Sequence, residues 1–198
     1  MDSTYSLIEQ AVRKKGIKVE RADKKQVAEA LSREGIDPND YNFSMDKKDI
    51  CIDAYENGDT IYMYKGYGQS RALCHEYIHK WWKNNGNETY AKIVQKKFPN
   101  KWSEVASSQE YSQILDNNVE IAGEVLAKSL EQELADYIEK NKDNIKGIEK
   151  CGINGIKSFG KEDFCRCICS ELFDNLETGG NFSIFEKVFG NVGYLMFD

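Results

Sequence analysis

Apolar residues recur three and four positions apart along most of the chain, which predicts a largely helical protein. Gly, Pro or Asn separates several of these segments, as expected where helices end. Asp23 is a suitable N-cap for the second helix. The expected helices span residues 3–15, 23–33, 71–84, 88–97, 108–141 and 161–176.

A short β segment interrupts this helical pattern. Residues 49–55 and 60–64 are β-prone and are joined by a turn that contains Asn57-Gly58, so they predict a hairpin. Residues 17–20 could form a further short strand. The hairpin leads directly into the helix at residues 71–84. The sequence therefore predicts an α+β fold, mostly helical, with a small antiparallel sheet before that helix.

The length of 198 residues suits a single domain covering residues 1–198. Within it we expect a central core at about residues 48–140. N-terminal helices would occupy residues 1–47, and a helical C-terminal appendage would occupy residues 150–198.

The charge balance narrows the classes of partner. With a net charge of −6, the chain has no general electrostatic attraction to nucleic acid or anionic membranes. The N-terminal lysines are not gathered on one face, which argues against a DNA-reading helix-turn-helix. No apolar run approaches the ~18 residues of a membrane span, and the first residues do not resemble a signal peptide. We therefore expect a cytoplasmic protein. The sequence does not indicate an oligomeric state.

The six cysteines are consistent with reduced thiols in such a compartment. Cys165, Cys167 and Cys169 alternate along an expected helix, on which the first and third share a side and the second faces away. This arrangement is a weak indication of a metal site. We interpret the three residues as small buried thiols.

Both histidines of the chain lie in the motif His75-Glu76-x-x-His79. Residues four apart on a helix point the same way, so the two imidazoles could bind one metal ion. Glu76 could then take a proton from metal-bound water. Apolar neighbours such as Leu73 and Ile78 predict a buried helix, in which these polar groups need a partner. The alternative is a pair of ordinary histidines on a structural helix.

A catalytic zinc site needs a third protein ligand, and the chain has no third histidine. We choose Glu120, because small and apolar residues from Gly123 to Leu134 follow it at helical spacing and define a buried face. Gly123 would also allow a close approach to the histidine helix. A second apolar face on the same helix keeps Glu124 and Asp116 open as ligands. Glu124 could instead orient a ligand histidine, and a solvated surface position for these carboxylates is the remaining alternative.

Two stretches carry a resemblance to a known family. The sequence Arg-Ala-Leu-Cys-His-Glu-Tyr-Ile-His at residues 71–79 resembles the active-site helix of gluzincin-type metallopeptidases, in particular the ImmA/IrrE-type peptidases. The sequence Glu-x-x-Gly-x-x-Leu-Ala-x-x-Leu from residue 120 is similar to that family's Glu-x-x-Ala-x-x-Phe-Ala-x-x-Leu helix. The resemblance covers about residues 48–135. It departs from the family at Ile78, where glycine is usual, and in the longer gap to Glu120.

The resemblance implies a zincin-like fold and a Zn²⁺ ion bound by His75, His79 and Glu120, with Glu76 as the general base. The implied function is zinc-dependent hydrolysis of peptide bonds in a specific protein partner. The developing oxyanion would need a further donor, for which the candidates are Arg71, Tyr67, Tyr90 and Tyr111. The alternative function is a catalytically silent regulatory or binding module of the same fold with a structural metal, against which the retained Glu76 argues.

Overall fold

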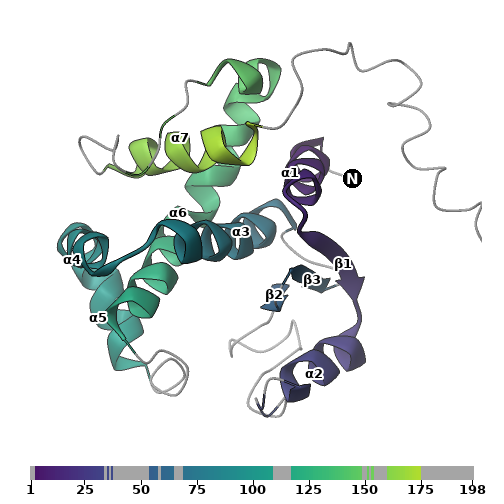
Figure 1. Cartoon of the computed structure of the whole chain (residues 1–198), viewed down its shortest axis with the longest axis horizontal. Coiled ribbons are helices and arrows are strands. Elements are labelled where there is room, and N and C mark those ends of the chain that lie inside the picture. The colour runs from purple at the N-terminus through teal and green to yellow at the C-terminus, as the bar shows by residue number, and fades with distance from the viewer. Residues whose placement is uncertain are drawn as a thin grey trace, which may run out of the picture.

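The computed structural model describes residues 3–33, 35, 37, 54–57, 59–64, 69–108, 117–148, 151, 153 and 160–174. Helices dominate this part of the chain, as predicted (Figure 1). They are α1 (Ser3–Lys14), α2 (Lys24–Arg33), α3 (Gln69–Asn85), α4 (Glu88–Lys97), α5 (Pro99–Ser107), α6 (Asn118–Asn141), the 3-10 helix η3 (Lys142–Gly147) and α7 (Lys161–Leu172). None of these described helices has the length and apolar character that a membrane span requires.

The helix boundaries follow local chemistry. Asp23 and Gln26 exchange reciprocal hydrogen bonds of 2.9 Å between side chain and backbone at the start of α2, which confirms the predicted cap. Pro99 begins α5, since proline at the first helical position loses no intrahelical hydrogen bond. This helix was not predicted from the sequence. The expected helix over 108–141 is shorter than predicted, since Asn117 caps α6. Residues 109–116 and the predicted C-terminal elements after residue 174 lie outside the described residues.

Three strands form one sheet in the order β1-β3-β2. They are β1 (Lys18–Ala22), β2 (Ala54–Asn57) and β3 (Thr60–Tyr64). The predicted hairpin is confirmed for β2 and β3, which pair antiparallel; residues 49–53 lie outside the description. The expectation of a wholly antiparallel sheet is wrong, because β1 pairs parallel to β3. A parallel pair needs a long crossover, and the connection from β1 to β3 includes α2.

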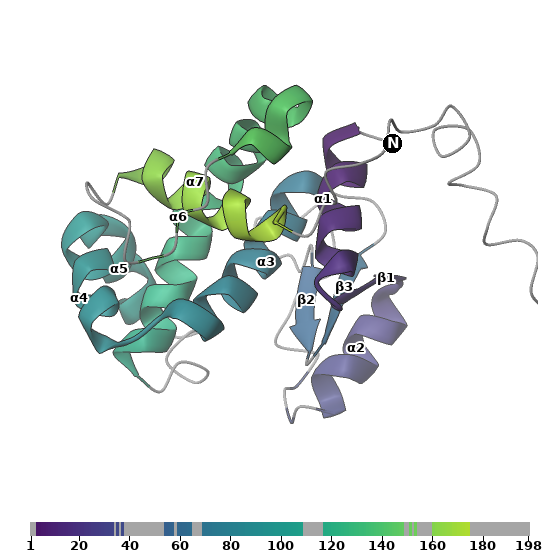
Figure 2. The same ribbon diagram turned by 45° about the horizontal axis from the view of Figure 1, so that its top comes forward.

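The sheet packs against helices on both sides (Figure 2). Val19, Ile61 and Met63 alternate inward and join the core that α1 and α3 complete. On the same side, the guanidinium of Arg21 lies 5.6 Å from the ring centroid of Tyr5 on α1. Helix α2 lies across the sheet from α1 and contacts β1 and β3. The sheet and α1 therefore form a base on which α3 rests.

Helix α6 is the central element of the helical layer, where it contacts α1, α3, α4, α5, α7 and η3. It packs closely against α3 at Gly123, where a Cβ atom would lie 2.8 Å from Cδ1 of Trp82. The indole Nε1 of Trp82 donates to the carbonyl oxygen of Val119 at 2.7 Å. The prediction that Gly123 allows a close approach between the two helices is thus confirmed. These contacts fix the position of α6 along α3.

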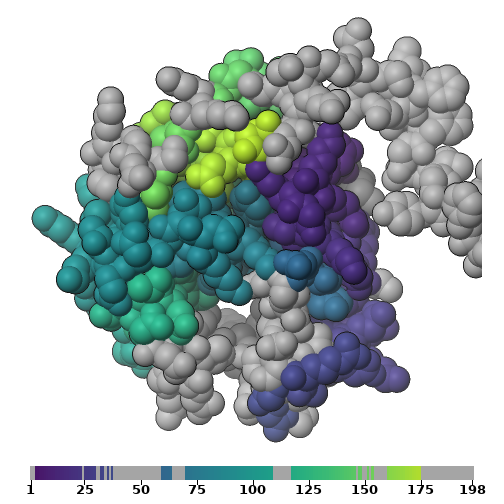
Figure 3. Space-filling view, viewed as in Figure 1, coloured from purple at the N-terminus to yellow at the C-terminus, as the bar shows by residue number. Residues whose placement is uncertain are grey.

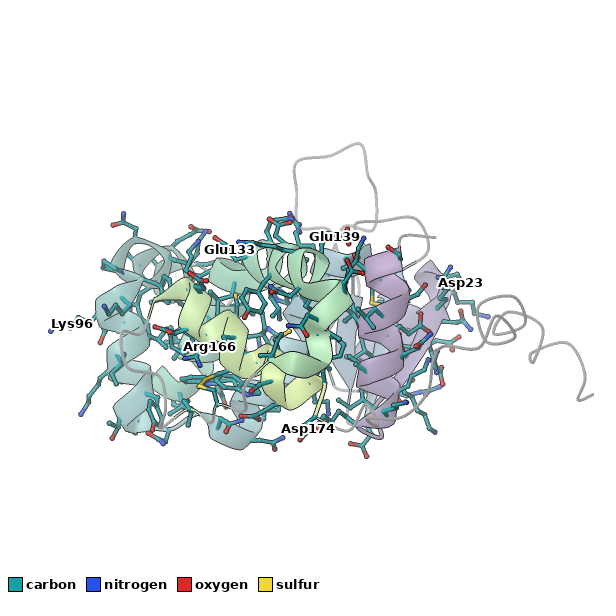
Figure 4. All side chains as sticks on the ribbon, turned by 90° about the horizontal axis from the view of Figure 1, so that it is seen from above. Asp23, Lys96, Glu133, Glu139, Arg166 and Asp174 are labelled. Atoms are coloured by element: carbon teal, nitrogen blue, oxygen red, sulfur yellow. A yellow bond between two sulfur atoms is a disulfide. The ribbon has the colours of Figure 1, made fainter. Side chains whose placement is uncertain are left out.

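The N-terminal helix is tied to the far end of the helical layer. Thr4 Oγ1 of α1 donates a hydrogen bond to Glu139 of α6, and Lys15 pairs with Asp174 after α7 (Figure 4). In the space-filling view α1 and α7 meet on one face of the molecule (Figure 3). Helices from both ends of the described chain, α1 and α7, therefore pack against the α3–α6 pair.

The cysteines correct one expectation from the sequence. Cys151 and Cys167 form a disulfide, so not all six cysteines are reduced thiols. Cys167 faces away from Cys165 and Cys169 on α7, as predicted, and this orientation brings it to Cys151. Cys165 and Cys169, together with Cys74 of α3, are free and buried, in agreement with the prediction of buried thiols. Burial raises the pKa of the Cys165 thiol to about 12, which keeps it protonated near neutral pH.

Candidate metal centre

Helices α3 and α6 bring three side chains to one point. The Nε2 atoms of His75 and His79 lie 3.1 Å apart. Oε2 of Glu124 lies 3.1 Å from Nε2 of His79 and 3.9 Å from Nε2 of His75. The two histidines come together because they are one helical turn apart, and Glu124 reaches them because Gly123 lets its helix pack closely.

These three atoms have the spacing that a metal ion requires. A tetrahedral zinc ion with bonds of about 2.0–2.1 Å holds its ligand atoms roughly 3.3–3.4 Å apart. Each residue offers one ligand atom, all within 4.8 Å of one another. The side chains of His75 and His79 are 19 and 24% exposed, whereas that of Glu124 is 8% exposed. Three ligands with a partly open histidine face are typical of a site that leaves a coordination position for water or substrate.

A second carboxylate on α6 lies beside the ring nitrogen of His75 that faces away from the other two ligand groups. Oε2 of Glu131 lies 2.8 Å from Nδ1 of His75. An ionised carboxylate can only accept, so the proton lies on Nδ1 and the imidazole donates it. In the neutral ring this leaves the lone pair of Nε2 facing His79 and Glu124, as a metal ligand requires.

The charges of the cluster offset the cost of its burial. Burial lowers the pKa of His75, but the hydrogen bond to Glu131 and the charges of Glu76, Glu124 and Glu131 outweigh it, so the pKa is raised above 6.5. For Glu124, burial raises the pKa. The hydrogen bond from His79 and the nearby charges of His79, His75 and Lys128 reverse this and lower it to about 2. The cluster therefore favours a positive charge between its ligand atoms, supplied by a proton or by a metal ion.

The structure does not bring Glu120 to the histidines. It lies exposed in the first turn of α6, where its backbone N–H donates to Asn117 Oδ1 at 3.1 Å. Glu124, an alternative ligand that the sequence left open, occupies the position expected of the third ligand. The other alternative, Asp116, lies outside the described residues. Glu120 lies on the exposed first turn of α6, whereas Glu124, one turn later, is buried against the histidines of α3.

Glu76 follows His75 on α3 and is buried, at 8% exposure. Its charge contributes to the raised pKa of His75, so its carboxylate lies near that ring. It is not one of the three grouped ligands. This placement beside the ligands agrees with a general base that does not itself bind the ion.

Two charged neighbours of the cluster, Lys128 and Glu131, were not identified from the sequence. Lys128 Nζ lies 3.8 Å from Oε1 of Glu124, and Arg71 Nε lies 3.3 Å from Oε1 of Glu131. The spacing i, i+4, i+7 from Glu124 through Lys128 to Glu131 could have indicated this face. The oxyanion candidates Tyr67 and Tyr111 lie outside the described residues.

Searches against protein-family models, curated proteins and solved structures find no match to this chain. The resemblance to ImmA/IrrE-type peptidases therefore depends on the motif residues, and the zincin-like fold stays a prediction.

Proposed function

We propose that this protein is a zinc-dependent peptidase whose metal ligands are His75, His79 and Glu124. The observation that carries the proposal is the convergence of three ligand atoms from two helices, with a buried glutamate directly after the first histidine. Glu124 replaces Glu120 in the predicted ligand set, and Glu76 keeps its predicted role.

Zinc would supply Lewis acidity. It would polarise a peptide carbonyl and lower the pKa of water, so that the water can be deprotonated for attack near neutral pH. Glu76 accepts a proton from the attacking water and returns it to the leaving amine, so that the C–N bond breaks and no net proton is consumed in this exchange. Glu131 keeps the Nε2 lone pair of His75 directed into the site. Lys128 places a positive charge beside the oxygen of Glu124 that faces away from His79.

The open side of the cluster favours catalysis over a purely structural metal. Structural zinc sites are closed by four protein ligands, whereas within the described part of the chain three residues group here, and both histidines are partly exposed. A catalytically silent binding module is the competing function. It needs the metal but has no use for the carboxylate of Glu76.

The test is the Glu76→Gln variant, with Glu88→Gln on the surface of α4 as the control. Both variants should retain zinc, because neither residue is a ligand. Glu76→Gln should lower cleavage of a proteome-derived peptide library by at least about 100-fold, because the proton acceptor is lost. New peptide termini are counted by mass spectrometry. A zinc-loaded wild type whose cleavage pattern equals that of Glu76→Gln would contradict the peptidase proposal and favour the silent module.

A further inference from the structure

The facing sides of α3 and α6 carry a column of charged and polar groups. On α3 it consists of Arg71, His75 and His79, and on α6 of Glu124, Lys128 and Glu131. The contacts run in opposite order along the two helices. Arg71 and His75 meet Glu131, and His79 meets Glu124. Trp82 against Gly123 continues this order at the far end.

Glu131 links two of these residues with separate oxygen atoms. Oε2 accepts the Nδ1 proton of His75 at 2.8 Å, and Oε1 lies 3.3 Å from Nε of Arg71. The Glu131 side chain is 20% exposed and that of Arg71 is 50% exposed. Ion pairs this exposed contribute little to folding stability. The Arg71–Glu131 pair is therefore better explained by its effect on the orientation of the Glu131 carboxylate than by an effect on folding stability.

We propose that Glu131 is a positioning residue of the metal site, held in place by Arg71, and that it selects the Nδ1–H tautomer of His75. The inference deepens the proposed function and depends on it for the identity of the metal. Glu131 does not contact the reacting atoms. It acts through His75, because an imidazole that must rotate or change tautomer before binding has a lower metal affinity.

Arg71 has a defined part in this arrangement. It lies one turn before His75 on α3, so Glu131 receives both of its partners from one face of one helix. Both carboxylate oxygens are engaged, which limits rotation of the carboxylate about its last bond. The position of His75 is then set by α3 and α6 together. The motif His75-Glu76-x-x-His79, by contrast, lies wholly on α3.

The first experiment measures zinc affinity by competition with a chromophoric chelator for wild type, Glu131→Ala, Glu131→Gln and Arg71→Gln. Glu131→Ala should weaken zinc binding by about 10- to 100-fold. Glu131→Gln should lose less, because its amide oxygen can still accept from Nδ1. The control is Asp136→Asn, whose carboxylate accepts from Gln132 on the outside of the same helix, and it should bind zinc within about twofold of wild type.

A second experiment reads the tautomer directly in the metal-free protein. Long-range ¹H–¹⁵N NMR at a pH where the imidazole is neutral should detect Nδ1–H for His75 in wild type. Glu131→Ala should shift the population toward Nε2–H, and Glu131→Gln should largely restore Nδ1–H. This readout separates positioning from a general loss of structure, which would not be reversed by the conservative variant.

The two experiments also separate this inference from the proposed function. A wild type that binds no zinc overturns the peptidase, while the tautomer measurement still decides the role of Glu131. Zinc affinity of both Glu131 variants within twofold of wild type overturns the positioning role and leaves the ligand set intact. Nε2–H as the main tautomer of His75 in wild type also overturns it.

Discussion

At the scale of single residues, Glu124 and Glu120 differ by one turn of α6 and have opposite environments. Glu124 is buried among two imidazoles and a lysine, so its charged form is stabilised and its pKa falls to about 2. Glu120 is exposed in the first turn. A ligand must be both ionised and close to the histidines, and Glu124 meets both conditions in the described part of the chain.

This difference predicts the outcome of two alanine substitutions. Wild type should carry about one zinc per chain, Glu124→Ala should lose most of it, and Glu120→Ala should retain it, because of these two glutamates it is Glu124 that offers an oxygen at 3.1 Å from His79. Metal content by mass spectrometry against protein concentration is the measurement. Loss of zinc in Glu120→Ala together with retention in Glu124→Ala would restore the ligand set that the sequence favoured.

At the scale of elements, the register between α3 and α6 decides whether the site exists. Trp82 and Gly123 fix it at one end through steric fit and through the indole hydrogen bond to Val119. A shift of α6 by one residue along its axis would move Glu124 about 1.5 Å. Such a shift is large compared with the tolerance of a metal–ligand bond.

Gly123→Ala should destabilise the protein even though alanine is the better helix former by about 1 kcal/mol. Its Cβ would lie 2.8 Å from a buried, hydrogen-bonded indole ring, and overpacking of this kind costs about 1–3 kcal/mol. Chemical denaturation measures the loss, and zinc affinity should fall with it. In a Trp82→Ala background the same substitution should cost nothing, which gives a double-mutant control. A Gly123→Ala protein as stable as wild type would show that α6 can move away without cost.

At the scale of the whole molecule, the metal site couples folding to pH. The pKa of Glu124 is lowered by folding, so its contribution to stability is present above about 4.5 and is lost as the pH falls toward 2. The pKa of His75 is raised by folding, so its contribution is complete below 6.5 and is lost as the pH rises through the folded-state value. In the metal-free protein both contributions are complete together only between about pH 4.5 and 6.5.

The metal-free protein should therefore have a higher Tm at pH 5.5 than at pH 8.5, measured by thermal unfolding in the presence of a chelator. Zinc should reverse the trend, since its ligands must be free of protons and its stabilisation grows with pH. His75→Gln should reduce the metal-free decline. A metal-free Tm that is higher at pH 8.5, with no change in His75→Gln, would contradict the role assigned to this histidine.

Several features of the fold could be predicted from the sequence because they depend on local chemistry. The helix carrying His75 and His79 follows from hydrophobic periodicity, the cap of α2 from Asp23, and the β2–β3 hairpin from its turn residues. Even Gly123 was identified correctly, because a small residue on an apolar face indicates close packing. In each case the atoms that interact are neighbours along the chain or repeat with the period of one element.

Other features depend on residues far apart in sequence, and only the tertiary structure decided them. Every residue from Ala122 to Ala127 is buried, so the hydrophobic period of α6 could not distinguish its faces. The parallel addition of β1 to β3 likewise depends on a crossover rather than on either strand. The sequence alone determined that two histidines and a glutamate share one turn of helix. The choice of Glu124 as their partner, and of Glu131 behind His75, required the packing of α6 against α3. The hydrophobic period of each helix does not show which residues of the other helix lie next to it.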